Sequence, residues 1–285
     1  MNLTHYPGRG RLAGRGGLWH CKRPMTTAGS GQPVSFWDDV GAHFPSLKGA
    51  PSTGYYFECE RLLFEGFAPK LRDLIVLKTD LWDEAKNTEI LRWVAEQGAR
   101  PAGVDVSLDI VRDARRVLAA HRPAFVGGDV RALPIRGASV DLVYSMGTIE
   151  HFPEYEAAVR EIFRILKPGG TAIVGVPNKL DPFLRPLLVH VLNAWGLYGY
   201  GMEKSFTPGS RRRLLESAGF RVTARTGILF IPGWLRMLDL WLHTRRPGLS
   251  VLTAGPVRAF AWLYRRIPAV RRHGYLTVCV AERPG

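Results

Sequence analysis

Short apolar runs separated by segments of helical periodicity are the main pattern along the chain. The runs at 74–77, 140–145 and 170–178 have the length and the β-branched content of buried strands. The segment 87–97 between two of the runs places apolar residues three and four positions apart, as amphipathic helices do. Strands that alternate with helices predict a doubly wound α/β fold built around a mostly parallel sheet.

The stretch 127–170 carries the most regular part of this pattern. It places Asp129 at the end of a short strand, then a buried strand at 140–145 and a loop with Glu150 and His151. An amphipathic helix follows, and we expect it to stop at the Lys-Pro-Gly-Gly sequence of residues 167–170, because proline and glycine end helices. The predicted apolar face of this helix holds Val159, Ile162, Phe163 and Leu166.

These motifs resemble those of a class I S-adenosylmethionine-dependent methyltransferase of the small-molecule (UbiE-like) type. The segments GD…LP, VDLVYS, EH and LKPGG occur in family order, and the resemblance extends over residues 74–220 with a last strand at 275–282. It implies a Rossmann-like sheet of seven strands, mostly parallel with an antiparallel last strand, and helices on both faces. It also implies S-adenosylmethionine as the cofactor.

The loop after the first strand departs from the family pattern. The family has an acidic residue and a glycine-rich turn there, whereas this chain has Lys78 followed by a glycine-free segment. The place where the amine of the cofactor would lie is crowded by Asp80, Asp83, Glu84 and Asn87, and we expect polar side chains of this loop to replace the backbone in holding it. The alternative is a lost cofactor pocket. The four predicted cofactor-binding residues are Thr79, Asp80, Asp83 and Asn87.

Further cofactor contacts are expected at the ends of the next strands. Asp105 follows a strand about 20 residues past the first turn, a position that suits two hydrogen bonds from ribose hydroxyls. Its alternative role is a helix N-cap, which Ser107 or Asp109 could also supply. The resemblance implies that Val106 packs on the adenine and that Asp129 accepts a hydrogen bond from it. Val130, Ser145 and Met146 complete the predicted set.

His151 is the predicted catalytic residue. A histidine with a pKa near neutrality can remove a proton from a substrate hydroxyl or an acidic carbon. The alternative is that Glu150 and His151 only shape the loop, and Glu154 and Tyr155 are weaker candidates for the base. The sequence shows no metal-ligand spacing, so we predict no metal.

Three segments outside the core are expected to shape the substrate site. Residues 34–73 are predicted as a helical lid, with Tyr55, Tyr56 and Glu60 as candidate lid residues, or as a helix packed on the sheet edge. The apolar inserts 181–204 and 230–274 interrupt the methyltransferase domain at 74–285. The second insert, rich in tryptophan and arginine, fits an interfacial membrane helix, a lid over an apolar substrate, or packing on the sheet.

Charge is distributed unevenly over the 285 residues, whose net charge is +14. Residues 1–25 hold five basic residues and no acidic one, and residues 204–285 hold 15 basic and three acidic residues, which leaves −3 for the part between. We predict a disordered basic tail at 1–33 and an anionic partner surface. Three distant cysteines, no signal peptide and no spanning run predict a cytoplasmic protein, with peripheral contact to the inner face of an anionic membrane.

The sequence therefore predicts an S-adenosylmethionine-dependent methyltransferase that acts on an oxygen or a carbon of a small lipophilic molecule, such as a lipid or an isoprenoid. One alternative is a cofactor-dead binding or scaffold protein with the same fold. The other is a nucleic-acid methyltransferase, which the charge would suit. We do not expect a nucleic-acid partner, because the core lacks an Asn-Pro-Pro-aromatic motif and a catalytic cysteine. The oligomeric state stays open.

Overall fold

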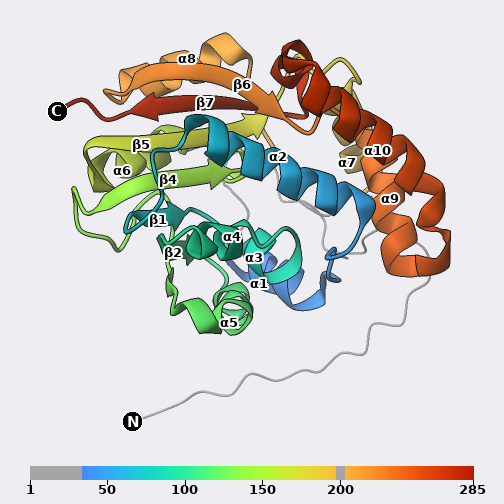
Figure 1. Cartoon of the computed structure of the whole chain (residues 1–285), viewed down its shortest axis with the longest axis horizontal. Coiled ribbons are helices and arrows are strands. Elements are labelled where there is room, and N and C mark those ends of the chain that lie inside the picture. Colours follow the sequence, from blue (N-terminus) through green and yellow to red (C-terminus); the bar gives the residue numbers. More distant parts are fainter. Residues whose placement is uncertain (1–33, 197–202) are drawn as a thin grey trace.

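A mixed sheet of seven strands forms the centre of the protein, in the order β3-β2-β1-β4-β5-β7-β6 (Figure 1). The structure is a computed structural model that describes residues 34–196 and 203–285, so the predicted tail lies outside the described residues. Strands β1 to β5 pair in parallel, and β7 is antiparallel to both of its neighbours, which confirms the predicted fold. The strands are β1 (Ile75–Lys78), β2 (Arg100–Asp105), β3 (Ala124–Gly127), β4 (Val140–Met146), β5 (Leu166–Pro177), β6 (Arg221–Ile228) and β7 (Leu276–Glu282).

Helices cover both faces of this sheet and form two apolar core layers. One layer packs the sheet against α2, α4, α5, α9 and α10, and the other packs it against α6 and α8. Buried Ile90, Leu91 and Val94 confirm the predicted inward face of α4. The α-helices are α1 (Val34–His43), α2 (Pro51–Phe67), α3 (Trp82–Lys86), α4 (Ile90–Glu96), α5 (Leu108–Val117), α6 (Tyr155–Ile165), α7 (Arg185–Ala194), α8 (Pro208–Ser217), α9 (Gly233–Arg245) and α10 (Val251–Arg266). Four short 3₁₀ helices are η1 (Ala119–His121), η2 (Ile149–His151), η3 (Pro247–Leu249) and η4 (Pro268–His273).

The helix before β5 ends within one residue of its predicted stop, but the strand begins at Leu166 instead of at the predicted Gly170. Helix α6 stops at Ile165, and Leu166 already pairs with Val140 of β4, so residues 166–170 belong to the strand. Backbone hydrogen bonds between Arg283 and Gly169–Gly170 extend the sheet over this segment. These long-range backbone bonds, which the local sequence does not reveal, decide the boundary.

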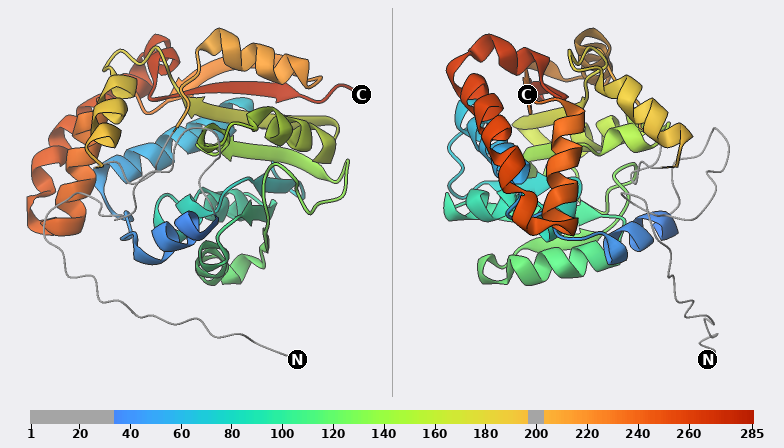
Figure 2. Two further views of the ribbon diagram at one scale, coloured as in Figure 1. Left: turned by 180° about the vertical axis from the view of Figure 1, so that it is seen from behind. Right: turned by 90° about the vertical axis from the view of Figure 1, so that its right-hand side faces the viewer.

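The insert between β6 and β7 folds into a helical cap beyond the carboxyl ends of the parallel strands. Helices α9 and α10 of this insert pack against each other, and α7 from the insert between β5 and β6 packs against α9 to complete the cap (Figure 2). The buried carboxylate of Asp239 in α9 accepts hydrogen bonds from the Ser52 backbone N–H of α2 at 2.8 Å and from the Thr253 hydroxyl of α10 at 2.5 Å. The Thr253 bond anchors the first turn of α10, which begins at Val251.

No helix in the described ranges is long and apolar enough to cross a membrane. The predicted boundary between a lid at 34–73 and a methyltransferase domain at 74–285 stays a prediction. In the structure, residues 34–73 contain α1 and α2, and the predicted insert 230–274 contains α9 and α10.

Candidate cofactor and substrate site

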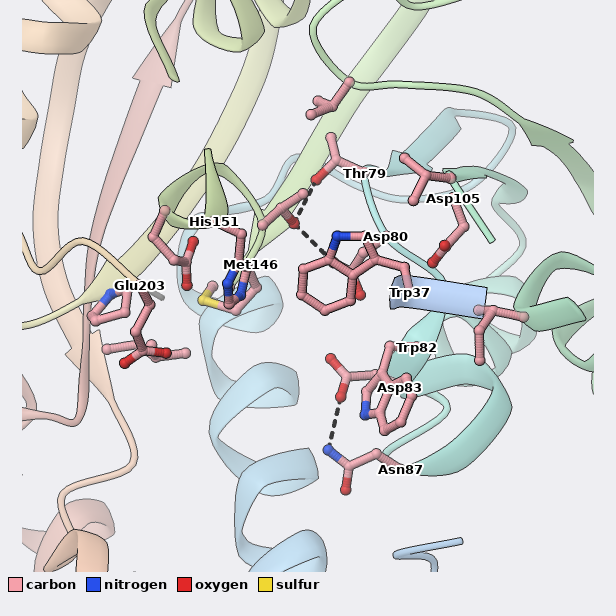
Figure 3. Close-up of a pocket in the computed structure, with 18 of the residues that line it drawn as sticks. Trp37, Thr79, Asp80, Trp82, Asp83, Asn87, Asp105, Met146, His151 and Glu203 are labelled. Carbon is pink, nitrogen blue, oxygen red and sulfur yellow. Dashed lines mark hydrogen bonds between the residues drawn. The ribbon is translucent and has the colours of Figure 1, made fainter. Parts of the chain in front are cut away.

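A cavity of about 280 Å³ opens at the carboxyl ends of the parallel strands (Figure 3). Residues that follow β1, β2, β3 and β4 form one part of its wall, and residues of α1, α2 and α9 form another part. Of the eleven residues predicted from the sequence as cofactor-binding or catalytic, the cavity wall contains Thr79, Asp80, Asp83, Asn87, Asp105, Val106, Asp129, Val130, Met146 and His151. Ser145 does not line the cavity: it is 1% exposed and accepts a hydrogen bond from the Thr79 hydroxyl at 2.8 Å.

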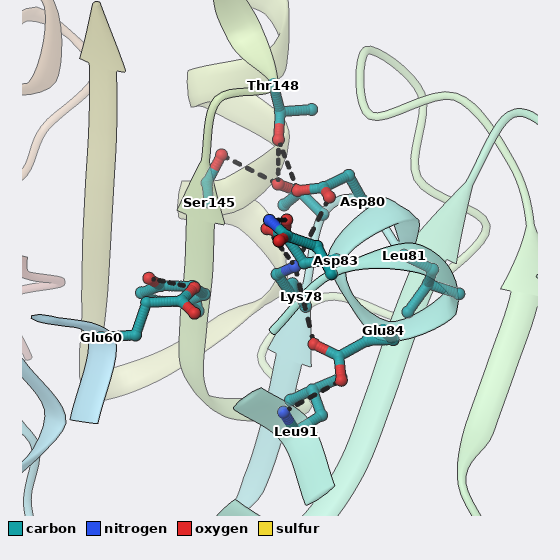
Figure 4. A network of polar contacts seen from close by, with 12 residues as sticks. Glu60, Lys78, Asp80, Leu81, Asp83, Glu84, Leu91, Ser145 and Thr148 are labelled. Atoms are coloured by element: carbon teal, nitrogen blue, oxygen red, sulfur yellow. Dashed lines mark hydrogen bonds and ion pairs between the residues drawn. The ribbon is translucent and has the colours of Figure 1, made fainter. Parts of the chain in front are cut away.

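The glycine-free loop is organised around the buried ammonium group of Lys78 (Figure 4). The Lys78 Nζ atom lies 3.0 Å from Asp83 Oδ2 and 3.5 Å from Asp80 Oδ1. Glu84 Oε1 is 3.6 Å away. Burial alone would lower the pKa of Lys78, but the surrounding carboxylates outweigh it and raise that pKa above its usual value. Lys78 is therefore protonated, and it draws the loop together by side-chain ion pairs.

Hydrogen bonds from outside the loop fix these carboxylates. Asn87 donates to Asp83 Oδ1 at 2.7 Å, and Thr53 of α2 donates to Asn87 Oδ1 at 2.8 Å. The Leu91 backbone N–H donates to Glu84 at 3.1 Å, and burial raises the pKa of Glu84 to about 7. Asp80 and Asp83 also line the cavity. The loop thus turns an excess of carboxylate toward the cavity, which suits a cationic ligand group.

A glycine in the neighbouring strand makes room for a side chain of this loop. Leu81, in the loop, is fully buried against Gly103 of β2. A Cβ atom at Gly103 would lie 2.4 Å from Leu81 Cδ2, so a side chain there would force the Leu81 side chain to shift. The loop therefore sits close to β2 although it contains no glycine of its own.

The carboxylate of Asp105 joins the end of β2 to this loop. Its Oδ2 atom accepts the Leu81 backbone N–H at 2.8 Å, and its Oδ1 atom accepts the Ser107 backbone N–H at 2.9 Å. Burial raises the pKa of Asp105 to about 7. The N-cap alternative is wrong, because Ser107 caps α5 through its own hydroxyl. Each carboxylate oxygen keeps a lone pair for a ligand hydroxyl.

Asp129 lies in the cavity wall but is already paired. Arg131 donates from Nε at 3.0 Å and from Nη2 at 2.6 Å to Asp129 Oδ2, and also pairs with Glu154 at 2.8 Å. Although burial acts in the opposite direction, these bonds lower the pKa of Asp129. A hydrogen bond from an adenine amino group would have to share this carboxylate with Arg131. The sequence reasoning missed this pairing.

His151 lies in η2 beside two buried carboxyl groups. The ligand atoms of Glu150, His151 and Glu203 lie within 4.8 Å of one another. Burial and the nearby Glu203 raise the pKa of Glu150 above its usual value. The arrangement has the residue types of a metal site, but the guanidinium group of Arg185 already pairs with Glu203. Glu203 is far from η2 in sequence, and sequence reasoning missed it.

A tryptophan from α1 covers this part of the cavity. The Trp37 and His151 rings meet edge to face with centroids 5.0 Å apart. Of the predicted lid residues, Tyr56 lines the cavity, whereas Tyr55 and Glu60 are buried elsewhere. Trp37 was missed because one aromatic residue in a short helix gives no pattern. The weaker base candidates Glu154 and Tyr155 lie outside the cavity wall.

Comparisons with known proteins agree with this geometry. A family model described as a methyltransferase domain matches residues 87–174, a range that begins just after the glycine-free loop. A probable S-adenosylmethionine-dependent methyltransferase of Mycolicibacterium smegmatis is 28% identical over 254 residues, which are 84% of this chain and 87% of that protein. A malonyl-acyl-carrier-protein O-methyltransferase of Methylococcus capsulatus is 28% identical over 188 residues, which are 60% of this chain and 66% of that protein.

A solved structure extends the comparison to the fold. An S-adenosylmethionine-dependent methyltransferase from Mesorhizobium loti superposes with a TM-score of 0.54 at 17% identity, over 84% of this chain and 100% of that one. This likeness concerns the fold alone, while the family match and the sequence relatives concern the activity. The family match and the sequence relatives support a class I S-adenosylmethionine-dependent methyltransferase, an enzyme that transfers the methyl group of this cofactor.

Proposed function

We propose that the enzyme methylates an oxygen or an acidic carbon of a small lipophilic molecule. The observation that carries this proposal is one cavity whose wall combines carboxylates, an aromatic ring and a histidine. Asp80, Asp83 and Asp105 supply the carboxylates, and Trp37 packs edge to face on His151, the candidate base. Such a cavity suits a polar cofactor beside an apolar acceptor.

The residues present fit S-adenosylmethionine. The Asp105 carboxylate would accept hydrogen bonds from the two ribose hydroxyls. The carboxylates of Asp80 and Asp83 would form ion pairs with the ammonium group of the methionine part. Val106 and Val130, which line the cavity, would pack on the adenine. Thr79, Asn87 and Met146 would complete the wall around the methionine part. The bound cofactor supplies an electrophilic methyl group, and the protein contributes mainly by positioning the acceptor in line with it.

His151 would remove the proton from the accepting atom. Glu203 lies beside its ring and would favour the protonated imidazole that results. We expect His151→Gln to lower kcat about 10²- to 10⁴-fold, the usual contribution of a general base. The affinity for S-adenosylhomocysteine should stay within about twofold of wild type, since the predicted cofactor contacts are elsewhere. Equal rates for variant and wild type would exclude His151 as the base.

The acceptor can be sought with labelled cofactor. Purified enzyme is incubated with methyl-labelled S-adenosylmethionine and a total lipid extract, beside malonyl thioesters and hydroquinones. We choose these two classes of compound because two relatives of the chain are named as a malonyl-acyl-carrier-protein O-methyltransferase and a ubiquinone-biosynthesis O-methyltransferase. We expect label in an organic-soluble product that His151→Gln does not form. Label in nucleic acid only would favour the nucleic-acid alternative.

Proton release on cofactor binding tests the role of Asp105. The pKa of its carboxyl is raised to about 7, so below pH 7 the free protein carries a proton there. Two ribose hydroxyls favour the ionised carboxylate, so binding should release up to about one proton at pH 6 and almost none at pH 8.5. Affinity for S-adenosylhomocysteine should accordingly rise between these pH values. Calorimetry in buffers of different ionisation enthalpy measures the release.

Glu84→Gln is the control for this experiment. The pKa of Glu84 is also raised to about 7, but this residue is buried outside the cavity wall. The variant should keep the proton release that we assign to Asp105. If the Glu84→Gln variant no longer released a proton on binding, the titrating group would be assigned to the carboxylates around Lys78 and not to Asp105.

We also propose that the helical cap touches an anionic membrane, from which a lipophilic acceptor would enter. Large apolar side chains on and beside α7, α9 and α10 are 57% to 72% exposed, and arginines of the same cap are exposed with them. Tryptophan and arginine on one surface are typical of interfacial helices. The apolar residues are Leu184, Leu187, Trp195, Trp234, Val251 and Leu252.

The double variant Trp195→Ala and Trp234→Ala tests the membrane contact. We expect it to bind anionic vesicles at least about 100-fold more weakly than wild type, because each of the two buried aromatic side chains contributes roughly 1.5–3 kcal/mol. Vesicle flotation measures the bound fraction. Leu108→Ala, at an exposed apolar residue on α5, should bind as wild type does. Equal flotation of the double variant and wild type would contradict the contact.

A further inference from the structure

Arg236 of α9 carries a hydrogen-bond donor that nothing in the described protein satisfies. Its side chain lines the same cavity, and its Nη1 atom is buried without a hydrogen-bond partner. Within residues 34–196 and 203–285, Arg236 also forms no ion pair with a carboxylate. An unsatisfied buried donor costs free energy, and a guanidinium group can only donate. A bound ligand with a hydrogen-bond acceptor next to Nη1 would remove this cost.

Two tyrosine rings hold this guanidinium group in place. Its Cζ atom lies 5.0 Å from the centroid of the Tyr56 ring and 5.8 Å from that of the Tyr275 ring. Aromatic faces stabilise a planar cation without satisfying its N–H groups. The rings thus fix where the donors of Arg236 lie and leave Nη1 available.

Comparison with Arg185 shows what is unusual about Arg236. Arg185 also lies against the Tyr275 ring, with its Cζ atom 4.0 Å from the centroid. Its charge is matched by the ion pair with Glu203. Both arginines thus stack on Tyr275. Arg185 forms an ion pair with a carboxylate of the protein, whereas Arg236 forms none among the described residues.

Sheet order places Arg236 away from the predicted nucleoside contacts. Arg236 belongs to the insert between β6 and β7, and Tyr275 directly precedes β7. Asp105 and Asp129 follow β2 and β3, which β1, β4 and β5 separate from β7. We propose that Arg236 binds a carboxylate or phosphate group of the acceptor, so that the substrate is an amphipathic acid. This assignment rests on the proposed function.

The test uses enzyme saturated with S-adenosylhomocysteine, whose binding is measured first. Decanoate and decyl phosphate serve as anionic probes and decanol as the neutral probe, and the fluorescence of the cavity tryptophans reports binding. We expect Arg236→Gln to weaken both anions about 10- to 100-fold and to leave decanol unchanged, because hydrogen bonds to a charged group are lost. Arg236→Lys should restore part of the affinity. Arg245→Gln, at an exposed arginine of the same helix, should bind as wild type does.

The remaining outcomes separate this inference from the proposed function. If wild type binds S-adenosylhomocysteine but neither anion, or if Arg236→Gln binds both anions as wild type does, the anion site is wrong and methyl transfer stands. If Arg236→Gln weakens S-adenosylhomocysteine but not 5′-methylthioadenosine, which has no carboxylate, Arg236 binds the cofactor and the proposal is overturned. If wild type does not bind S-adenosylhomocysteine, the proposed function itself fails.

Discussion

Replacing Lys78 with methionine is expected to lower the free energy of unfolding by about 3–5 kcal/mol, the usual cost of removing one partner from a buried ion pair. The ammonium group of Lys78 is fully buried and lies within 3.6 Å of Asp80, Asp83 and Glu84. Without it, these carboxyl groups would face one another in a low-dielectric environment. They would have to bind protons or admit water, and the loop would open.

Urea unfolding of Lys78→Met, compared with wild type at one pH, measures this loss. Lys167→Met is the matched control, because Lys167 has one ion pair, to Asp141, and a side chain 43% exposed. An exposed pair contributes about 1 kcal/mol or less. Adding Glu84→Gln to Lys78→Met should recover part of the stability, since it removes one unpaired carboxylate. If Lys78→Met were as stable as the control, the ion-pair account of the loop would be wrong.

Replacing Asp105 with alanine is expected to weaken binding of S-adenosylhomocysteine by at least about 100-fold. Hydrogen bonds to a charged group contribute about 1.5–3 kcal/mol each, and the proposed grip on ribose uses two. The variant also deprives the Leu81 and Ser107 backbone N–H groups of their acceptor, so the loop loses its tie to β2. Both effects act in the same direction.

Calorimetry of Asp105→Ala beside Asp109→Ala separates this effect from a general loss of charge. Asp109 lies in the first turn of α5, only four residues away, and pairs with Arg112. We expect it to bind as wild type does. Circular dichroism should show that both variants fold. Unchanged affinity in Asp105→Ala would place the ribose elsewhere in the cavity.

The sequence was sufficient for the parts of the protein that local patterns determine. Buried strands appear in the sequence as apolar runs. Acidic residues at the carboxyl ends of parallel strands, such as Asp105, must lie at one edge of the sheet. That rule is topological, so it needs no knowledge of side-chain packing. Together with the family resemblance, it placed ten predicted residues at the edge of the sheet where the cavity lies.

Long-range contacts account for most of what the sequence did not reveal. Trp37, Glu203 and Arg236 reach the cavity from segments that are distant from the strands, and no local period marks them. Ser145 does not line the cavity, because its hydroxyl is buried against that of Thr79. The most unusual feature, Lys78, was visible in the sequence, but only the structure shows that its partners are three acids of its own loop.

The central claim is that a loop built on Lys78 and its carboxylates serves the cofactor in place of the family's glycines. Calorimetric titration of the wild-type protein with S-adenosylhomocysteine tests it most directly. We predict binding of one molecule per chain with a micromolar dissociation constant, accompanied by a rise in the unfolding temperature. No heat of binding and no change in unfolding temperature, with protein that is folded by circular dichroism, would contradict the claim and favour a binding protein that has kept the fold without the cofactor.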